Sequence, residues 1–238
     1  MNTRVADVRS EPEPLGAKAA IDPEKLFHQL FDAYGPQHWW PAKTALEVML
    51  GAILTQNTNW SNVEKALTHL RQQRLLSESG LKAVSLEHLA QLIRPAGFYR
   101  RKSACIKSLI DWLQFHGGIA ALAQQSGAQL RTGLLNIPGI GAETADAILL
   151  YALGKPVFVV DKYTRRIVSR IGLLDYDMSY AQHQKFLTAR LLSDLSLFQE
   201  FHALFVIHAK THCRSIPKCE ICPLRADCSY RLLSLDLK

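Results

Sequence analysis

The chain has 238 residues, of which 48% are hydrophobic and 21% charged. This composition supports a buried core, and the length exceeds one average domain, so we expect two compact lobes or one large one. The formal net charge of +7 is compatible with an anionic partner without establishing one, because many basic proteins never touch nucleic acid. No run of about 18 apolar residues occurs, which excludes a membrane-spanning helix.

Residues 1–22 are predicted to form a disordered leader. The first twenty residues mix charged side chains with two prolines and contain no apolar segment, which is unlike a secretory signal. Order is expected to begin near Ile21. We therefore expect a cytoplasmic protein, associated with the nucleoid if its source is bacterial.

From Pro23 onward the apolar residues recur mainly at helical spacing, which predicts an all-α fold. Glycine and proline turn signals separate the helices, at residues 35–36, 79–80, 95–97, 117–118, 138–139 and 154–156. Residues 157–160 alone have the composition of a strand. Because four residues between a proline turn and an aspartate cannot make a sheet, we predict a buried extended connector there.

A short turn, Pro138-Gly139-Ile140-Gly141, lies between helical patterns that end near Asn136 and resume over residues 144–153. Its two glycines allow a tight turn and bring backbone N–H groups close to a ligand. Such a hairpin can hold a phosphate, often with a bound monovalent cation, and fixes position on nucleic acid without reading its sequence. A plain connection between two helices is the alternative.

Asp161 follows the apolar run 157–160 and precedes another helical pattern. An aspartate at this place can simply cap the helix by accepting backbone N–H bonds. The helix dipole and those hydrogen bonds also keep the carboxylate ionised. It is therefore also a candidate to stabilise an oxocarbenium ion or to orient a water molecule.

Four of the five cysteines lie close together near the C-terminus, at Cys213, Cys219, Cys222 and Cys228. Thiols this close in a chain without an export signal predict a metal centre in place of disulfides. Zinc and an iron–sulfur cluster both accept four thiolates, so the spacing leaves both open. Nearby basic residues predict a cationic loop able to meet phosphates. The fifth cysteine, Cys105, is expected to be a buried, inert thiol.

The hairpin, the aspartate and the cysteines, in this order and at this separation, resemble the endonuclease III family of helix-hairpin-helix DNA glycosylases. The resemblance covers residues 23–228 and implies a [4Fe–4S] cluster on the four cysteines, with one residue fewer than usual between the first two. It implies a two-lobed all-α fold: a six-helix lobe over residues 37–152, with the helix-hairpin-helix at about 132–153, and a second lobe from 23–36 and 153–238. The cluster loop spans 213–228.

Bifunctional members of that family carry a lysine two residues after the second hairpin glycine, where this chain has Glu143. A carboxylate cannot form a Schiff base with the sugar. The resemblance therefore implies a monofunctional reaction, in which water attacks C1′ and Asp161 stabilises the charge or activates that water. An abasic site remains.

Further matches are similar to 3-methyladenine DNA glycosylase III, a branch that removes N-methylated purines. They lie at residues 39–41, 54–58, 94–99, 143–149 and 159–163. Some members of the branch lack the cluster cysteines, which this chain retains. The resemblance implies a base pocket lined by Trp39, Trp40, Pro41 and Trp60, with Glu143 beside it. Indoles suit an electron-poor purine by stacking and cation–π attraction; ordinary core tryptophans are the alternative.

Three more positions follow from the resemblance. Gln56 corresponds to a side chain inserted into the gap left by a flipped nucleotide, and Phe98 to an apolar wedge on the opposite strand. Lys210 matches a pocket-edge lysine that can be carbamylated, or else contacts a phosphate, and the sequence leaves both open.

The predicted function is base-excision repair: hydrolysis of the N-glycosidic bond of alkylated purines such as 3-methyladenine, by a monomer acting on damaged double-stranded DNA. The first alternative is a glycosylase with AP-lyase activity on oxidised pyrimidines. The second is a non-catalytic DNA-binding protein that keeps the hairpin and the cluster.

Overall fold

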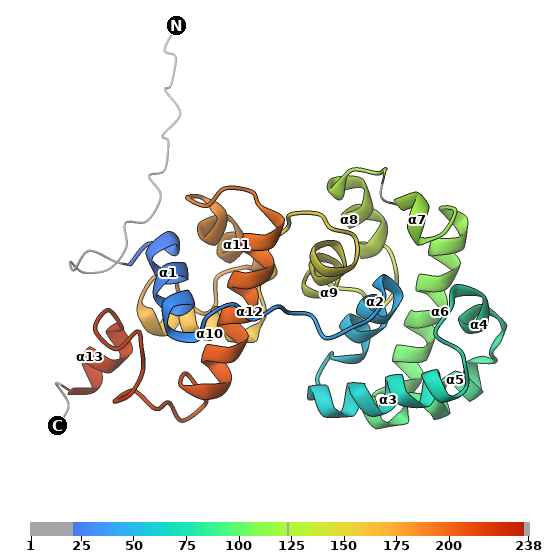
Figure 1. The fold of residues 1–238 in the computed structure, drawn as a ribbon, viewed down its shortest axis with the longest axis horizontal. Coiled ribbons are helices and arrows are strands. Elements are labelled where there is room, and N and C mark those ends of the chain that lie inside the picture. The colour runs from blue at the N-terminus through green and yellow to red at the C-terminus, as the bar shows by residue number, and fades with distance from the viewer. Residues whose placement is uncertain (1–20, 123, 236–238) are drawn as a thin grey trace, which may run out of the picture.

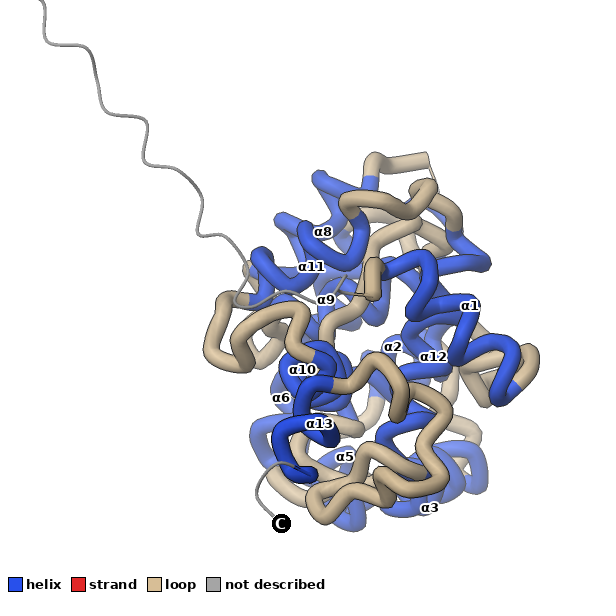
Figure 2. Tube along the Cα trace, turned by 90° about the vertical axis from the view of Figure 1, so that its left-hand side faces the viewer, coloured by secondary structure: helices blue, strands red, loops and turns tan. Residues whose placement is uncertain are grey.

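The computed structural model describes residues 21–122 and 124–235. Within those ranges every regular element is a helix and no strand occurs (Figure 2), which confirms the all-α prediction. The disordered leader predicted over 1–22 lies outside the described residues except for its last two. Of these, Ile21 is buried and Asp22 caps the first helix by accepting from the Lys25 N–H.

The helical elements occur in the following order. They are α1 (Pro23–Tyr34), α2 (Ala45–Leu54), α3 (Trp60–Gln72), α4 (Glu78–Ala83), α5 (Leu86–Leu92), η1 (Arg94–Ala96), α6 (Tyr99–Phe115), α7 (Ile119–Leu122), α8 (Gly127–Leu135), α9 (Ala142–Ala147), η2 (Ile148–Ala152), α10 (Lys162–Ile171), α11 (Tyr180–Thr188), α12 (Leu195–Thr211) and α13 (Ser229–Leu235).

Two groups of helices lie side by side in Figure 1. Helix α12 packs against α1 and α10 in one group, which also contains α11 and α13. The other group is built around α2, which packs against α3, α6, α9 and η2. The chain crosses between the groups twice, through residues 35–44 and 153–161. Residues from both crossings can therefore meet residues from both groups.

Local sequence signals explain where the helices begin. Side chains of Asp, Asn, Ser or Thr accept the N–H three residues on at the starts of α1 to α5, α8 and α10 to α12. Each such cap satisfies a backbone donor that the helix itself leaves unpaired. Helix α9 differs, because it starts at Gly141 with no side-chain cap.

The segment after the hairpin departs from the single helix predicted over 144–153. Helix α9 ends at Ala147 and continues as one π-helical stretch, η2, over Ile148–Ala152. Apolar periodicity cannot separate these two hydrogen-bonding patterns here, because every residue from 144 to 150 is buried. π-helical turns occur frequently at functional sites, and this one carries Tyr151.

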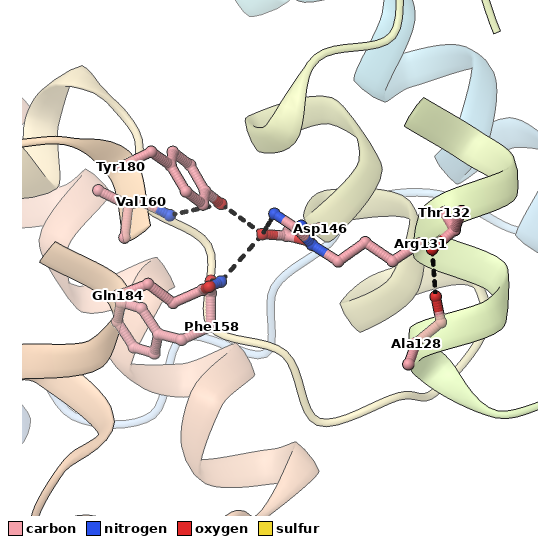
Figure 3. Close-up of polar contacts among 8 residues, drawn as sticks. All are labelled: Ala128, Arg131, Thr132, Asp146, Phe158, Val160, Tyr180 and Gln184. Carbon is pink, nitrogen blue, oxygen red and sulfur yellow. Dashed lines mark hydrogen bonds and ion pairs between the residues drawn. The ribbon is translucent and has the colours of Figure 1, made fainter. Parts of the chain in front are cut away.

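A buried carboxylate joins the two groups of helices. Asp146 of α9 is fully buried and accepts two hydrogen bonds from Arg131 of α8, at 2.7 and 3.2 Å. From α11, Tyr180 and Gln184 donate to its other side at 2.8 and 2.9 Å (Figure 3). Gln184 also donates to the carbonyl of Phe158, on the connector. A buried charge needs such complete pairing, so this network fixes how the groups face each other.

Candidate active site

A cavity of about 230 Å³ lies between the two groups of helices. Its walls come from the first crossing segment, the end of α2, the start of α3, α9, the connector before α10, and α12. Five of the six predicted pocket residues line it, together with the predicted catalytic Asp161 and the predicted DNA-inserting Gln56. The five are Trp39, Trp40, Trp60, Glu143 and Lys210. The structure therefore gathers residues that are up to 171 positions apart in the chain, from 39 to 210.

Three indoles form one wall of the cavity. The ring centroids of Trp39 and Trp40 lie 6.2 Å apart, and the Trp60 ring lies 5.5 Å from that of Trp40. The Trp60 indole N–H donates to Glu64 at 3.0 Å, which fixes its orientation. Pro41 is exposed and is not among the lining residues. The turn that brings both tryptophans to the cavity leaves this proline outside it.

Asp161 is the N-cap of α10, as its position in the sequence indicated. Its Oδ1 accepts from the backbone N–H of Thr164 at 2.7 Å and from the Thr164 hydroxyl at 2.9 Å. Burial alone would raise its pKa, but His202 and the Thr164 donors outweigh burial and lower the pKa below its usual value. The carboxylate therefore remains charged inside the cavity, with Oδ2 free of the cap.

Glu143 is the second carboxylate of the cavity. It lies in the first turn of α9, immediately beyond the hairpin, and more than a third of its surface remains open to solvent. Desolvation and the negative charge of Asp161 raise its pKa, opposed by His202 and Lys162. A positive ligand between the carboxylates would relieve that repulsion.

His202, which lines the cavity, and its neighbour Tyr151 were missed by the sequence analysis. His202 is 5% exposed and its Nδ1 lies 2.8 Å from the Tyr151 hydroxyl, which also donates to the Gln199 carbonyl at 3.1 Å. A signal was available, since His202, Val206 and Lys210 recur every four residues along α12 and all line the cavity. The contact with Tyr151 depends on the π-helical stretch and had no such signal.

Lys210 lies at the rim of the cavity. It is exposed, and its Nζ stands 5.5 Å from the centroid of the Trp39 ring. That geometry is a cation–π contact. Among the described residues that line the cavity it is the only lysine.

The hairpin presents its backbone beside the cavity. Gly139 has φ +95°, and a Cβ there would also meet the buried Cys105 at 3.2 Å, so both conformation and packing require glycine. Gly141 has an ordinary φ of −96°, and a Cβ would meet nothing within 4 Å. Pro138 is exposed, whereas Ile140 is buried and anchors the turn. Glycine at 141 is thus not required by the fold itself.

Gln56 connects the hairpin to the end of α2. Its Nε2 donates to the Gly139 carbonyl at 3.0 Å and to the Thr144 hydroxyl at 2.9 Å. A second cavity, of about 180 Å³, opens on the other side of Gln56 and includes Phe98 among its lining residues. Phe98 is 62% exposed and has φ 45°, a strained conformation for an aromatic residue. A side chain held out at that angle is not a core aromatic.

Lys102 of α6 ties the half-buried Gln56 and the exposed Phe98 together. Its Nζ is buried and donates at 2.8 Å to the carbonyls of Leu54, Gln56 and Ala96. Burial lowers its pKa to about 8, whereas three carbonyl acceptors favour the ammonium form. One side chain thus closes the end of α2, holds the Gln56 backbone and fixes η1, which leads directly into Phe98.

Replacing Lys102 with methionine should lower both the stability and the affinity for duplex DNA. Three buried carbonyls lose their donor, which costs about 2–3 kcal/mol of unfolding free energy. Lys107→Met is a matched control, because Lys107 also donates to three carbonyls, those of Leu81, Lys82 and Val84, but lines neither cavity. Urea unfolding should show comparable losses in the two variants, and fluorescence anisotropy should show weaker DNA binding for Lys102→Met alone.

The four C-terminal cysteines surround one common space. Cys213 is buried at the end of α12, and all four thiols are free and line a single cavity together with His208 and Arg170. Arg170 donates to the Cys213 sulfur at 3.4 Å. Within the part of the chain that is described, no three His, Cys, Asp or Glu residues converge closely enough for a single metal ion. The four free thiols around one space are a donor set that either zinc or an iron–sulfur cluster accepts.

The chain belongs to the HhH-GPD superfamily of base-excision DNA repair proteins, whose family model matches residues 50–191. That span includes the hairpin, Glu143 and Asp161. Together with its relatives, this membership identifies the protein as a DNA repair glycosylase of that superfamily.

The relatives are similar over most of their length. A Methanocaldococcus jannaschii protein, named provisionally as a DNA repair glycosylase, is 42% identical over 86% of this chain and 94% of its own. Endonuclease III of Sulfolobus acidocaldarius is 27% identical, over 80% of this chain and 84% of its own length.

Solved structures match the fold. The H. pylori 3-methyladenine DNA glycosylase bound to 1,N6-ethenoadenine has a TM-score of 0.71 at 28% identity, covering 79% of this chain and 97% of that one. An endonuclease III–DNA complex has a TM-score of 0.77 at 23% identity, covering 90% of this chain and 96% of that one. The family match, the endonuclease III relative and the H. pylori structure together confirm the predicted membership of the endonuclease III family, and the endonuclease III–DNA complex shows the same fold. Over the described residues, no helix is long and apolar enough to cross a membrane.

Proposed function

We propose that this glycosylase is monofunctional and releases alkylated, positively charged purines such as 3-methyladenine from double-stranded DNA. The observation that carries the proposal is Glu143, an acidic side chain beyond the hairpin that faces Asp161 in an indole-lined cavity. The same residue excludes a Schiff base at that position and supplies negative charge to a cationic base.

The walls of the cavity suit such a base. Electron-rich indole faces attract a cationic ring by stacking and cation–π interaction, worth roughly 0.5–2 kcal/mol for each contact. The two carboxylates, Glu143 and Asp161, outnumber the single lining ammonium of Lys210. The H. pylori relative, named as a 3-methyladenine glycosylase, is consistent with this preference.

The chemistry needs little help on the leaving group. A purine methylated at N3 carries a positive charge, so its glycosidic bond breaks readily and the base departs as a neutral molecule. Positive charge then develops on the sugar, where the ionised Asp161 stabilises it. Water adds to C1′ and leaves an abasic site.

DNA is held by the hairpin in this proposal. The open space at Gly141 allows a phosphate to approach the uncapped start of α9, with or without a monovalent cation. Gln56 and Phe98 stand on adjacent exposed turns, which suits filling the gap after base flipping and wedging the opposite strand. The partner is damaged duplex DNA, bound by a monomer.

We also propose that Cys213, Cys219, Cys222 and Cys228 hold a [4Fe–4S] cluster. Four unpaired thiols around one cavity, with Arg170 donating to a sulfur, support this assignment. The cluster, when bound, orders the basic loop 213–228 and takes no part in base release.

A cluster makes the purified protein brown. We expect visible absorbance that disappears, together with the order of the loop, when iron is removed under denaturing conditions. Replacing Cys222 with serine should bleach the protein, whereas Cys105→Ser should leave its colour intact, since Cys105 lies buried below the hairpin. A colourless wild-type protein that contains zinc would contradict the assignment.

Base release from a panel of lesions tests the proposed activity. Duplexes treated with a methylating agent should lose free 3-methyladenine, whereas duplexes with thymine glycol should remain intact. Release of thymine glycol with strand cleavage would favour a glycosylase and lyase for oxidised pyrimidines. Binding to duplex DNA without release of any base would favour a non-catalytic role.

A further inference from the structure

His202 faces the charged oxygen of Asp161 without bonding to it. The His202 Nε2 lies 3.8 Å from Asp161 Oδ2, too far for a hydrogen bond, and has no hydrogen-bond partner among the described residues. Both side chains line the main cavity, and that of His202 is more than nine-tenths buried. A buried ring nitrogen without a partner is costly, so something absent from the protein itself is expected to bond to it.

Neighbouring residues determine which ring nitrogen carries the proton. The Tyr151 hydroxyl donates its proton to the Gln199 carbonyl at 3.1 Å. When that proton goes to Gln199, the Tyr151 oxygen accepts the 2.8 Å hydrogen bond from His202, and the compatible tautomer carries its proton on Nδ1. In the neutral ring, Nε2 then presents a lone pair to the cavity.

Two acceptors at this separation can share one water molecule. A water about 2.8 Å from each would donate one proton to Nε2 and the other to Oδ2, and would direct its own lone pairs away from both. We propose that His202 is a catalytic residue that holds the nucleophilic water with Asp161 and takes its proton. This role rests on the proposed monofunctional reaction.

The step balances without a further reactant. The water oxygen forms a bond to C1′, and the C1′–N bond breaks with its electron pair going to the base. One water proton passes to Nε2 of His202, and the resulting imidazolium is stabilised by Asp161 and by the Nδ1–H bond to Tyr151. The proton later returns to solvent.

Two substitutions separate holding the water from accepting its proton. In His202→Gln the amide oxygen can still accept a hydrogen bond but cannot take the proton, so single-turnover base release should fall about 10²-fold. In His202→Phe neither role survives, so the loss should be larger. In methanol–water mixtures His202→Phe should also form several-fold more methyl glycoside relative to abasic product. With Asp161 as the single remaining acceptor, a molecule with two donor protons is no longer favoured over methanol, which has one. Affinity for duplex DNA containing an abasic analogue should be unchanged.

His183→Gln is the matched control. His183 is a fully buried histidine of α11 whose Nε2 likewise has no partner in the described chain, but it does not line the cavity. The role of His202 would be overturned if the His202 and His183 variants showed equal rates and equal methanol partitioning. If the wild-type protein still released methylated purine, the proposed function would remain intact. No release by the wild-type protein would contradict both.

Discussion

Replacing Asp161 with asparagine should reduce base release by at least about 10³-fold while leaving the fold intact. Asparagine caps helices about as well as aspartate, so α10 should keep the hydrogen bond from Thr164. What disappears is the negative charge that stabilises the sugar cation. Single-turnover release from methylated duplex, with circular dichroism and DNA binding measured in parallel, separates catalysis from folding.

Asp194→Asn is the control for the capping role. Asp194 begins α12 in the same way, accepting from the Leu197 N–H at 2.7 Å, but it is exposed and lies outside the cavity. This variant should release base at the wild-type rate. Equal activity of Asp161→Asn and Asp194→Asn would reduce Asp161 to a helix cap and remove it from the mechanism.

Replacing Asp146 with alanine should lower the unfolding free energy by about 3–5 kcal/mol. The substitution leaves Arg131, Tyr180 and Gln184 without their shared acceptor at the junction between the two groups of helices. Urea unfolding gives the loss directly. Adding Arg131→Met to Asp146→Ala should recover part of it, because the unpaired guanidinium is then absent.

An exposed ion pair serves as the control for the buried Asp146 network. Lys82 and Asp111 lie 2.5 Å apart, with more than half of each side chain in solvent. Asp111→Ala should cost less than about 1 kcal/mol. Similar losses for Asp146→Ala and Asp111→Ala would mean that the buried network does not fix the junction.

The sequence predicted the parts of this protein that depend on local patterns. Apolar periodicity and turn residues indicate helices, and Asp161 appears as a cap because capping is decided within four residues. Glu143 was singled out through the resemblance, from its fixed distance to Gly141 in the motif of that family. The grouping of Trp39, Trp60 and Lys210 came from a resemblance, since no local pattern brings such distant residues together.

Contacts between distant helices were beyond that reasoning. The pairing of Asp146 with Tyr180, and of Tyr151 with His202, depends on how α9 and η2 meet α11 and α12. The three carbonyls gathered by Lys102 likewise come from two separate turns. Pro41 was placed in the pocket because it follows Trp39 and Trp40 in the sequence. In the structure it is exposed and does not line the cavity.

The central claim is that Glu143, in place of a lysine, leaves this glycosylase without an amine that could form a Schiff base with the sugar. Borohydride reduction during incubation with abasic duplex DNA tests it most directly, with a lysine-containing endonuclease III as the positive control. We expect the control to become covalently attached to DNA and this protein to remain free, while it still releases 3-methyladenine from methylated duplex. A reduced covalent complex between this protein and abasic DNA would contradict the claim.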